Sequence, residues 1–178
     1  MRQGDPLAIE CGTIRLIILD VDGVLTDGRV YLDARGEEIK AFHVRDGQGI
    51  RLWLDAGHEI GIITGRKSGA LAHRAKELGI GHVYQGSRDK LEDYRHLLRK
   101  VNLTGDEVAM VGDDLPDLPI MRHVGFPVAV GDAVGEVKEA AKYITEKAGG
   151  RGAVREVIEL VMRERGEWAR AVERIRGR

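Results

Sequence analysis

The sequence predicts an α/β protein built on a doubly wound parallel sheet, and two observations support this fold class. Short apolar runs rich in β-branched residues alternate with longer segments of helical periodicity, as in strands that helices connect. Glycine accounts for 24 of the 178 residues, about twice the average share of roughly 7%, and most glycines stand between the apolar runs. This length fits one compact domain, residues 1–178.

Strands are expected where both faces of a run are apolar, as in a covered parallel sheet. The first such run is residues 14–20, which ends on Asp20. The other expected strands are residues 60–64, 82–84, 108–112 and 128–130. Helices are expected at residues 49–56, 68–78 and 90–101, where apolar side chains recur at helical spacing.

Two segments depart from this alternation. Residues 29–42 predict a β-hairpin flap with its turn at residues 33–36, directly after the first strand. The flap has more apolar residues than a solvated hairpin needs, and a lone hairpin is barely stable in water, so hairpins of several subunits are expected to pair. Residues 152–178 predict a helical tail of one or two helices.

Composition excludes several classes of protein. The 28 Lys and Arg against 29 Asp and Glu give a net charge of −1, which excludes a globally basic nucleic-acid binder. No run approaches the roughly 18 apolar residues of a membrane span. Cys11 is the only cysteine, so it forms no internal disulfide. The first twelve residues lack the pattern of a signal peptide, so a cytoplasmic location is expected, with neither nucleic acid nor membrane as a partner.

Polar side chains gather where the expected strands end. They are Asp20 and Asp22, then Thr64, Gly65 and Arg66, then Lys90 at a helix start, then Asp113, Asp114 and Asp117. Taken alone, Asp20 and Asp22 also fit an ordinary polar strand exit. Ligands of open α/β sheets bind beyond the carboxyl ends of the strands, where all these residues converge. Carboxylates suit Mg²⁺, and a hydroxyl, a backbone N–H and a cation suit phosphate, so the pattern predicts phosphoryl transfer.

The motifs Asp20-x-Asp22-Gly-Val-Leu-Thr, Thr64-Gly-Arg, Lys90 and Gly-Asp113-Asp-x-x-Asp, in this order, resemble the haloacid dehalogenase (HAD) superfamily of phosphatases. The resemblance implies a HAD-like, Rossmann-type core. It implies that Asp20 is a nucleophile that forms an aspartyl-phosphate and that Asp22 is the general acid and then the base. It further implies the following ligands: Asp20, the Asp22 carbonyl and Asp113 for Mg²⁺, Asp114 and Asp117 behind them, and Thr64, Gly65 and Lys90 for the phosphoryl group.

Members of this superfamily usually carry a cap domain over the site. Residues 28–59 and 64–90 are filled by the hairpin, two helices and a strand, so neither gap holds a domain of even roughly 50 residues. The chain is therefore expected to be capless. A capless site needs cover from elsewhere, such as a neighbouring subunit.

Over nearly its whole length the chain is similar to the 3-deoxy-D-manno-octulosonate (KDO) 8-phosphate phosphatases. The matching segments are residues 22–28, 37–42, 44–50, 62–66, 77–80, 84–86, 124–125 and 148–156. The resemblance implies a small phosphorylated sugar acid as substrate, a step in lipopolysaccharide precursor biosynthesis, and a homotetramer with associated hairpins. The substrate contacts that it implies are Asp22, His43 (where relatives often have Asn), Arg45, Asp46, Gly47, Arg51, Gly65, Arg66, Arg74 and Lys90.

The glycine-rich segment at residues 149–152 suggests a further contact. Glycines let it adapt, and Arg151 offers a planar cation to a carboxylate, so the segment is expected to close over an active site, that of an adjacent subunit. The plainer interpretation is a link to the C-terminal helix.

Other interpretations stay open at this point. The substrate could be a nine-carbon sugar acid 9-phosphate of the sialic acid or 2-keto-3-deoxynononate type, or the chain could be a non-catalytic sugar-acid binder. A two-component receiver domain shares clustered acids, a Thr and a Lys, but lacks the Asp-x-Asp motif. Arg51 and Arg74 also fit a helix surface, and Asp46 also fits a cap on the helix that follows it. Five histidines share no spacing and are interpreted as surface residues: His58, His73, His82, His96 and His123.

Overall fold

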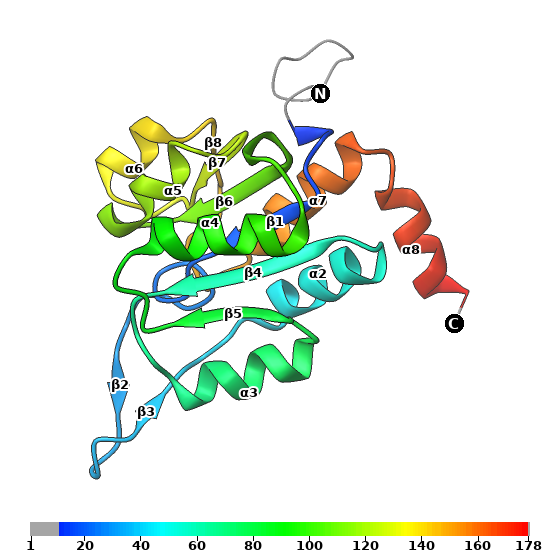
Figure 1. The fold of residues 1–178 in the computed structure, drawn as a ribbon. Coiled ribbons are helices and arrows are strands. Elements are labelled where there is room, and N and C mark those ends of the chain that lie inside the picture. The colour runs from blue at the N-terminus through cyan, green and yellow to red at the C-terminus, as the bar shows by residue number, and fades with distance from the viewer. Residues whose placement is uncertain (1–10, 178) are drawn as a thin grey trace.

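The computed structural model describes residues 11–177, and a parallel sheet of six strands is its central layer (Figure 1). The strands lie in the order β5 (His82–Gln85), β4 (Glu59–Thr64), β1 (Leu16–Leu19), β6 (Val108–Gly112), β7 (Phe126–Ala129) and β8 (Tyr143–Ile144). Every neighbouring pair is parallel. The predicted doubly wound α/β fold is therefore confirmed.

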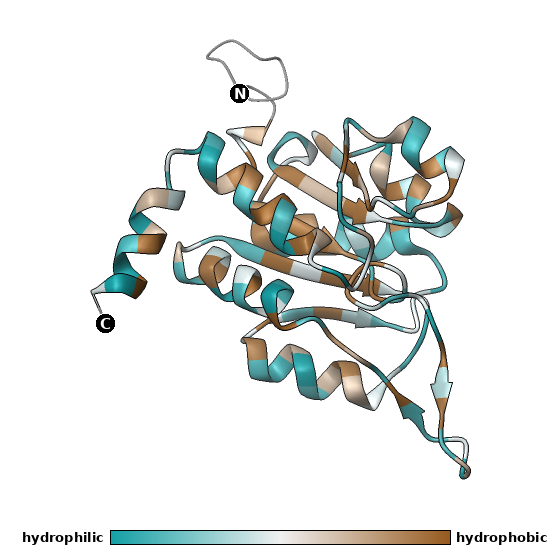
Figure 2. Cartoon of the chain, turned by 180° about the vertical axis from the view of Figure 1, so that it is seen from behind, coloured by the Kyte–Doolittle hydropathy of each residue, from teal (hydrophilic) through white to brown (hydrophobic). Residues whose placement is uncertain are grey.

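Helices cover both faces of this sheet. They are α2 (Val44–Asp55), α3 (Gly69–Leu78), α4 (Lys90–Val101), α5 (Leu118–Met121), α6 (Gly135–Ala140), α7 (Ala153–Glu164) and α8 (Trp168–Arg176), with 3₁₀ turns η1 (Gly105–Glu107) and η2 (Leu115–Asp117). Helices α2 and α7 pack side by side on one face, and α4 and α5 lie on the other (Figures 1 and 2). The connection from β5 to β6, which includes α4, lies on the opposite face of the sheet from α2, as a doubly wound sheet requires.

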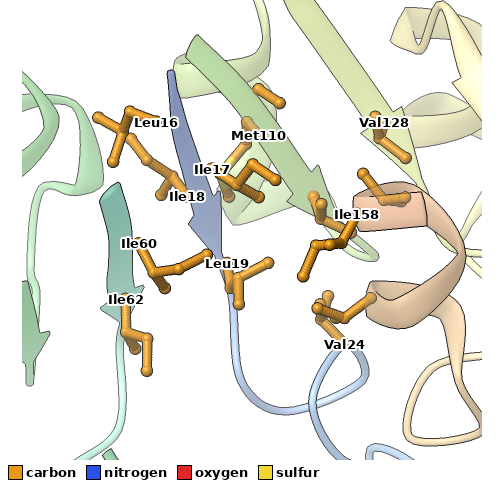
Figure 3. Close-up of a cluster of buried hydrophobic side chains, with 14 of the residues drawn as sticks. Leu16, Ile17, Ile18, Leu19, Val24, Ile60, Ile62, Met110, Val128 and Ile158 are labelled. Atoms are coloured by element: carbon orange, nitrogen blue, oxygen red, sulfur yellow. The ribbon is translucent and has the colours of Figure 1, made fainter. Parts of the chain in front are cut away.

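The core is built around β1. All four of its residues are buried, and so are the apolar side chains of the flanking strands and most of those of α7 (Figure 3). A strand apolar on both faces belongs in the middle of a covered sheet, because each of its faces packs against helices. The core therefore fixes β1, and with it the residues that follow this strand.

The register of the sheet aligns three strand ends. Leu19 pairs with Ile62 of β4 and with Val111 of β6, and the backbone N–H of Asp20 donates to the carbonyl oxygen of Val111 at 3.2 Å. Asp20, Thr64 and Asp113 therefore emerge at the same edge of the sheet.

The hairpin lies where it is predicted but is less regular. Strands β2 (Tyr31–Leu32) and β3 (Glu38–Ile39) pair antiparallel and extend away from the body of the protein (Figure 1). The side chains of Val30, Leu32 and Ile39 are more than half exposed. The hairpin and α2 are the only elements between β1 and β4, and α3 and β5 fill the gap before Lys90, so the chain is capless.

Helix α2 begins at Val44, five residues before the predicted start. Gly49 lies inside the predicted helix and Gly47 before it, and both are buried in α2. A Cβ at Gly47 would lie 2.1 Å from Arg74 Nη2, and one at Gly49 would lie 3.0 Å from Arg155 Cδ. The glycines therefore permit close packing of α2 against α3 and α7, which outweighs their poor helix propensity.

Three further features differ from prediction or complete it. Helices α5 and α6 and strand β8 are too short to stand out in the sequence. The tail forms two helices, separated at Gly166, whose φ of +72° favours glycine. The prediction that His58 is a surface residue is wrong, since its side chain is 9% exposed, contacts Glu167 and packs against the ring of Trp53. Among residues 11–177, no helix combines the length and apolar character of a membrane span.

Candidate active site

The turn at residues 20–28, here called the acidic turn, is shaped by a glycine and a threonine. Gly23 has a φ of +95°, and a Cβ there would lie 1.9 Å from Asp113 Oδ2. The Thr26 hydroxyl accepts from the backbone N–H groups of Gly23 and Gly28 at 3.4 and 3.3 Å, and it donates to the carbonyl oxygen of Val21. Gly23 thus lets the turn approach Asp113, and Thr26 holds the turn closed.

Lys90 joins the acids of two strands. Its ammonium nitrogen lies 3.0 Å from Asp20 Oδ1 and 2.8 Å from Asp117 Oδ1. The other oxygen of Asp117 accepts from the backbone N–H of Asp113 at 3.0 Å. Asp117 is 1% exposed, so Lys90 and the amide compensate a buried charge that would otherwise be costly. Asp117 therefore orients both Lys90 and the loop of Asp113.

The neighbouring carboxyl groups of the site raise one another's pKa. Burial and the neighbouring Asp117 raise the pKa of Asp20 to about 6, although Lys90 opposes this shift. Burial, Asp117, Asp20 and Asp114 together raise the pKa of Asp113 to about 8. Such shifts mean that the carboxylates repel one another and lack solvation. A cation between them would relieve both effects.

The acids fit a divalent metal ion. One carboxylate oxygen from each of Asp20, Asp113 and Asp117 lies within 4.8 Å of the others. Asp113 Oδ1 is buried, and no hydrogen-bond partner reaches it from the described residues. An unpartnered buried carboxylate oxygen is the atom that a cation would contact. Oxygen donors with few protein ligands suit Mg²⁺, which retains water and takes phosphate oxygens. Because Asp117 is already occupied by Lys90 and an amide, Asp20 and Asp113 are the better placed ligands.

The acids open onto a hollow of about 820 Å³ at the carboxyl edge of the sheet. Its lining comprises Asp20, Asp22, Gly28, Val30, Thr64, Gly65, Arg66, Lys90, Asp113, Asp114, Pro116 and Asp117. All residues predicted at the strand ends are therefore brought together. Anionic ligands for a metal and cationic or N–H donors for a phosphate meet here, so the hollow can hold both groups.

The remaining predicted substrate contacts lie elsewhere in the chain. His43, Asp46, Gly47 and Arg74 line a separate, mainly apolar pocket. Arg45 is exposed on α2. Arg51 donates to the carbonyl oxygen of Glu77, and Arg74 pairs with the Glu77 carboxylate at 2.8 Å. Within one chain, these residues do not join the acidic hollow.

Asp46 has a structural task in this chain. Its buried carboxylate accepts from the backbone N–H of Gly152 at 3.2 Å and from that of Arg155 at 2.8 Å. These amides begin α7, so Asp46 caps a helix distant in sequence instead of α2, inside which it lies.

The glycine-rich segment 149–152 packs against the acidic turn of its own chain. A Cβ at Gly149 would lie 1.6 Å from the carbonyl oxygen of Gly23, and the N–H of Gly150 donates to the carbonyl oxygen of Val24 at 2.9 Å. The glycines thus serve close contact with the turn. Arg151 is exposed beside it, and its closure over an active site stays a prediction.

Two residues of the hairpin contact the site without having been given a role from the sequence. The Lys40 ammonium pairs with Asp22 and Glu38, and the Arg66 guanidinium pairs with Glu38 at 2.7 Å. A hydrogen bond from Ser68, then Arg66 and Lys40, lower the pKa of Glu38 to about 2. The sequence feature that points to these two residues is that residues 37–42 match the KDO 8-phosphate phosphatases, although no motif of the superfamily includes them.

Comparison with known proteins places the chain in a family. Residues 75–158 match the haloacid dehalogenase-like hydrolase family. The 3-deoxy-D-manno-octulosonate 8-phosphate phosphatase of Escherichia coli K12 is 52% identical over 154 residues, which are 86% of this chain and 82% of that protein. The chain belongs to the KDO 8-phosphate phosphatase family of the HAD superfamily.

Solved structures of KDO 8-phosphate phosphatases agree with this assignment. That of the Yersinia pestis phosphatase is 46% identical with a TM-score of 0.91, covering 93% of this chain and 89% of that one. That of the Moraxella catarrhalis phosphatase, in complex with magnesium ion, phosphate ion and KDO, is 38% identical with a TM-score of 0.93, covering 97% and 99%. Family and fold make this chain a phosphoric monoester hydrolase.

Proposed function

We propose that this phosphatase hydrolyses KDO 8-phosphate to KDO and phosphate, with Mg²⁺ as its cofactor, as a step in lipopolysaccharide precursor biosynthesis. The observation that carries the proposal is the meeting of Asp20, Asp113 and Lys90 in one hollow that also presents Thr64 and Gly65. The identity of 52% to a KDO 8-phosphate phosphatase supports the choice of substrate.

Asp20 is the proposed nucleophile. Its carboxylate oxygen attacks phosphorus while the bond from phosphorus to the sugar oxygen breaks, which leaves an acyl phosphate on Asp20. Asp22 donates a proton to the departing sugar oxygen. Asp22 then takes a proton from a water molecule whose oxygen attacks phosphorus, and the Asp20 carboxylate is released. Two displacements replace one difficult hydrolysis.

The neighbouring groups prepare Asp20 for attack. Lys90, at 3.0 Å, favours the ionised form of a carboxylate that burial would otherwise protonate. The Thr64 hydroxyl and the Gly65 N–H are donors for the phosphoryl oxygens. When it is bound by Asp20, Asp113 and the carbonyl oxygen of Asp22, Mg²⁺ supplies positive charge that offsets the repulsion between carboxylate and phosphate. Asp117 supports these ligands through Lys90 and the N–H of Asp113, and Asp114 caps the turn η2 that carries Asp117.

The sugar acid is proposed to be bound by arginines and by a neighbouring subunit. Arg66 lines the hollow in the same chain. Because His43, Arg45, Asp46, Gly47, Arg51, Arg74 and Arg151 lie outside the hollow, we infer that those in contact with substrate reach it from a neighbour in a homotetramer. The exposed apolar side chains of the hairpin support such an assembly. The cytoplasmic location stays a prediction from the sequence.

The substrate is tested by comparing kcat/KM for KDO 8-phosphate, N-acetylneuraminate 9-phosphate and 2-keto-3-deoxynononate 9-phosphate. KDO 8-phosphate is expected to be preferred at least about tenfold, the size of a modest difference in pocket contacts. A preference for either nine-carbon ester would overturn the assignment. Asp20→Asn should abolish turnover with the fold intact, and EDTA should silence the enzyme until Mg²⁺ is restored.

A further inference from the structure

Four charged side chains close a ring at the base of the hairpin, here called the charge ring. Lys40 contacts Asp22 Oδ1 and lies 3.3 Å from Glu38 Oε1. Arg66 Nη2 lies 2.7 Å from Glu38 Oε1, and its Nε lies 3.6 Å from Asp22 Oδ2. Each oxygen of Asp22 thus faces one cation of the ring.

The members of the charge ring come from three parts of the chain. Asp22 belongs to the acidic turn after β1, and Arg66 follows β4. Glu38 and Lys40 belong to the second arm of the hairpin. The ring is therefore the ionic connection between the hairpin and the side chain proposed as acid and base.

Because it is buried, Lys40 has the fewest alternative interaction partners of the four side chains in the charge ring. Its side chain is 4% exposed, whereas that of Arg66 is 49% exposed. A buried ammonium that faces two carboxylates is held by its partners, because leaving them would cost its desolvation. Removing Lys40 would leave Asp22 and Glu38 with Arg66 alone, which is half exposed and lies 3.6 Å from Asp22 Oδ2, so Asp22 would be held less firmly. Arg66 is also exposed enough to turn toward a substrate.

We propose that Lys40 is a positioning residue for Asp22, and that through it the docked hairpin sets the position of the acid during departure of the leaving group. This inference rests on the proposed function, since it needs Asp22 as the acid. It also gives the hairpin a task within its own chain, besides contact between subunits. The competing role of Lys40 is a purely structural one, in which it only holds the hairpin in place.

The dependence of the rate on the leaving group distinguishes a positioning role of Lys40 from a purely structural one. For a double displacement, kcat/KM covers the steps up to departure of the first leaving group, and only this part needs Asp22 as acid. A misplaced acid therefore harms poor leaving groups, which need a proton, more than good ones. The experiment measures log(kcat/KM) for p-nitrophenyl phosphate, phenyl phosphate and an alkyl phosphate in Lys40→Met, with unfolding temperature recorded in parallel. Lys40→Gln is the second variant, should Lys40→Met fail to fold.

The expected result is a loss of about 10–100-fold on the alkyl ester and under about threefold on p-nitrophenyl phosphate, part of the 10²–10⁴-fold typical of general acid catalysis. Arg35→Met is the matched control, because Arg35 pairs only with Asp33 and Glu37 at the exposed tip of the same hairpin among the described residues, and it should leave all three esters unchanged. Equal losses on all esters in Lys40→Met would overturn the proposal.

A double-mutant cycle with Asp22→Asn separates this inference from the proposed function. Asp22→Asn should steepen the dependence on the leaving group, and Lys40→Met should add no more than about threefold in that background. If Asp22→Asn leaves the dependence unchanged, the acid role of Asp22 fails. If Asp22→Asn steepens it but the losses of the two variants multiply, the acid role stands and the positioning role of Lys40 is refuted.

Discussion

Gly149→Ala tests how the glycine-rich segment supports the acidic turn. The added Cβ would lie 1.6 Å from the carbonyl oxygen of Gly23 and 2.5 Å from its carbonyl carbon. Both atoms are backbone, so no side chain can swing aside, and restoring ordinary contact requires a shift of roughly 2 Å. Gly149 is not in the left-handed region, so alanine adds no backbone strain there, and the effect is purely one of space.

The shift should affect both stability and rate. Overpacking of this kind costs about 1–3 kcal/mol of unfolding free energy, and in a chain of this size that lowers Tm by roughly 2–12 °C. Because the turn carries Asp22 and abuts Asp113, kcat/KM should fall about 10–100-fold, as expected for an ångström-scale displacement of catalytic groups.

The assay is steady-state hydrolysis of KDO 8-phosphate with parallel thermal unfolding. Gly81→Ala is the matched control, because a Cβ there meets no atom of residues 11–177 within 4 Å and its φ is also outside the left-handed region. It should keep full activity and gain up to about 1 kcal/mol from reduced freedom of the unfolded chain. If Gly149→Ala behaves like Gly81→Ala, the segment does not support the turn and the reasoning fails.

Three further outcomes follow from the site and the surface. The pKa of Asp113 is raised to about 8 in the metal-free fold, so the folded state binds a proton more tightly than the unfolded state. The free energy of unfolding in EDTA should therefore fall as pH rises from about 4 to 8. Mg²⁺ should raise Tm more at pH 8 than at pH 5, and an equal rise at both would contradict this. The exposed apolar side chains of the hairpin predict a tetramer by sedimentation at micromolar concentration, because association of hairpins would bury them, and a monomer would contradict that prediction. Arg151→Ala should weaken use of KDO 8-phosphate but spare p-nitrophenyl phosphate, whereas equal losses would assign Arg151 to the fold or the chemistry.

Much of the site follows from the sequence because of sheet geometry. Asp20, Thr64 and Asp113 each end an apolar run, and parallel strands place their carboxyl ends at one edge whatever the helices between them do. The helix at residues 90–101 is also predicted to the residue, because its apolar side chains recur at helical spacing from one end to the other, and in the structure Asp89 caps it. At these positions the local sequence pattern and the geometry of a parallel sheet predict the same structure.

The remainder depends on contacts between distant segments. The role of Asp46 at α7 lies 106 residues away along the chain, and no local pattern announces it. The burial of His58 results from its contact with Glu167, which lies 109 residues further along the chain. Lys40 reads as one polar residue of a hairpin arm, and only the fold brings it to Asp22. The start of α2 at Val44 is missed, because the close packing of Gly47 against Arg74 is a contact between helices that no local pattern shows.

The stereochemical course at phosphorus tests the central claim, attack by Asp20, most directly. A phosphate monoester whose phosphoryl group is chiral through three oxygen isotopes is supplied to the wild-type enzyme together with an acceptor alcohol, and the configuration is read from the phosphate ester that the acceptor forms. Two in-line displacements, first by Asp20 and then by the acceptor, predict retention of configuration, and Asp20→Asn should give no turnover above background. Inversion in the wild-type enzyme would mean a single displacement and would contradict the covalent mechanism.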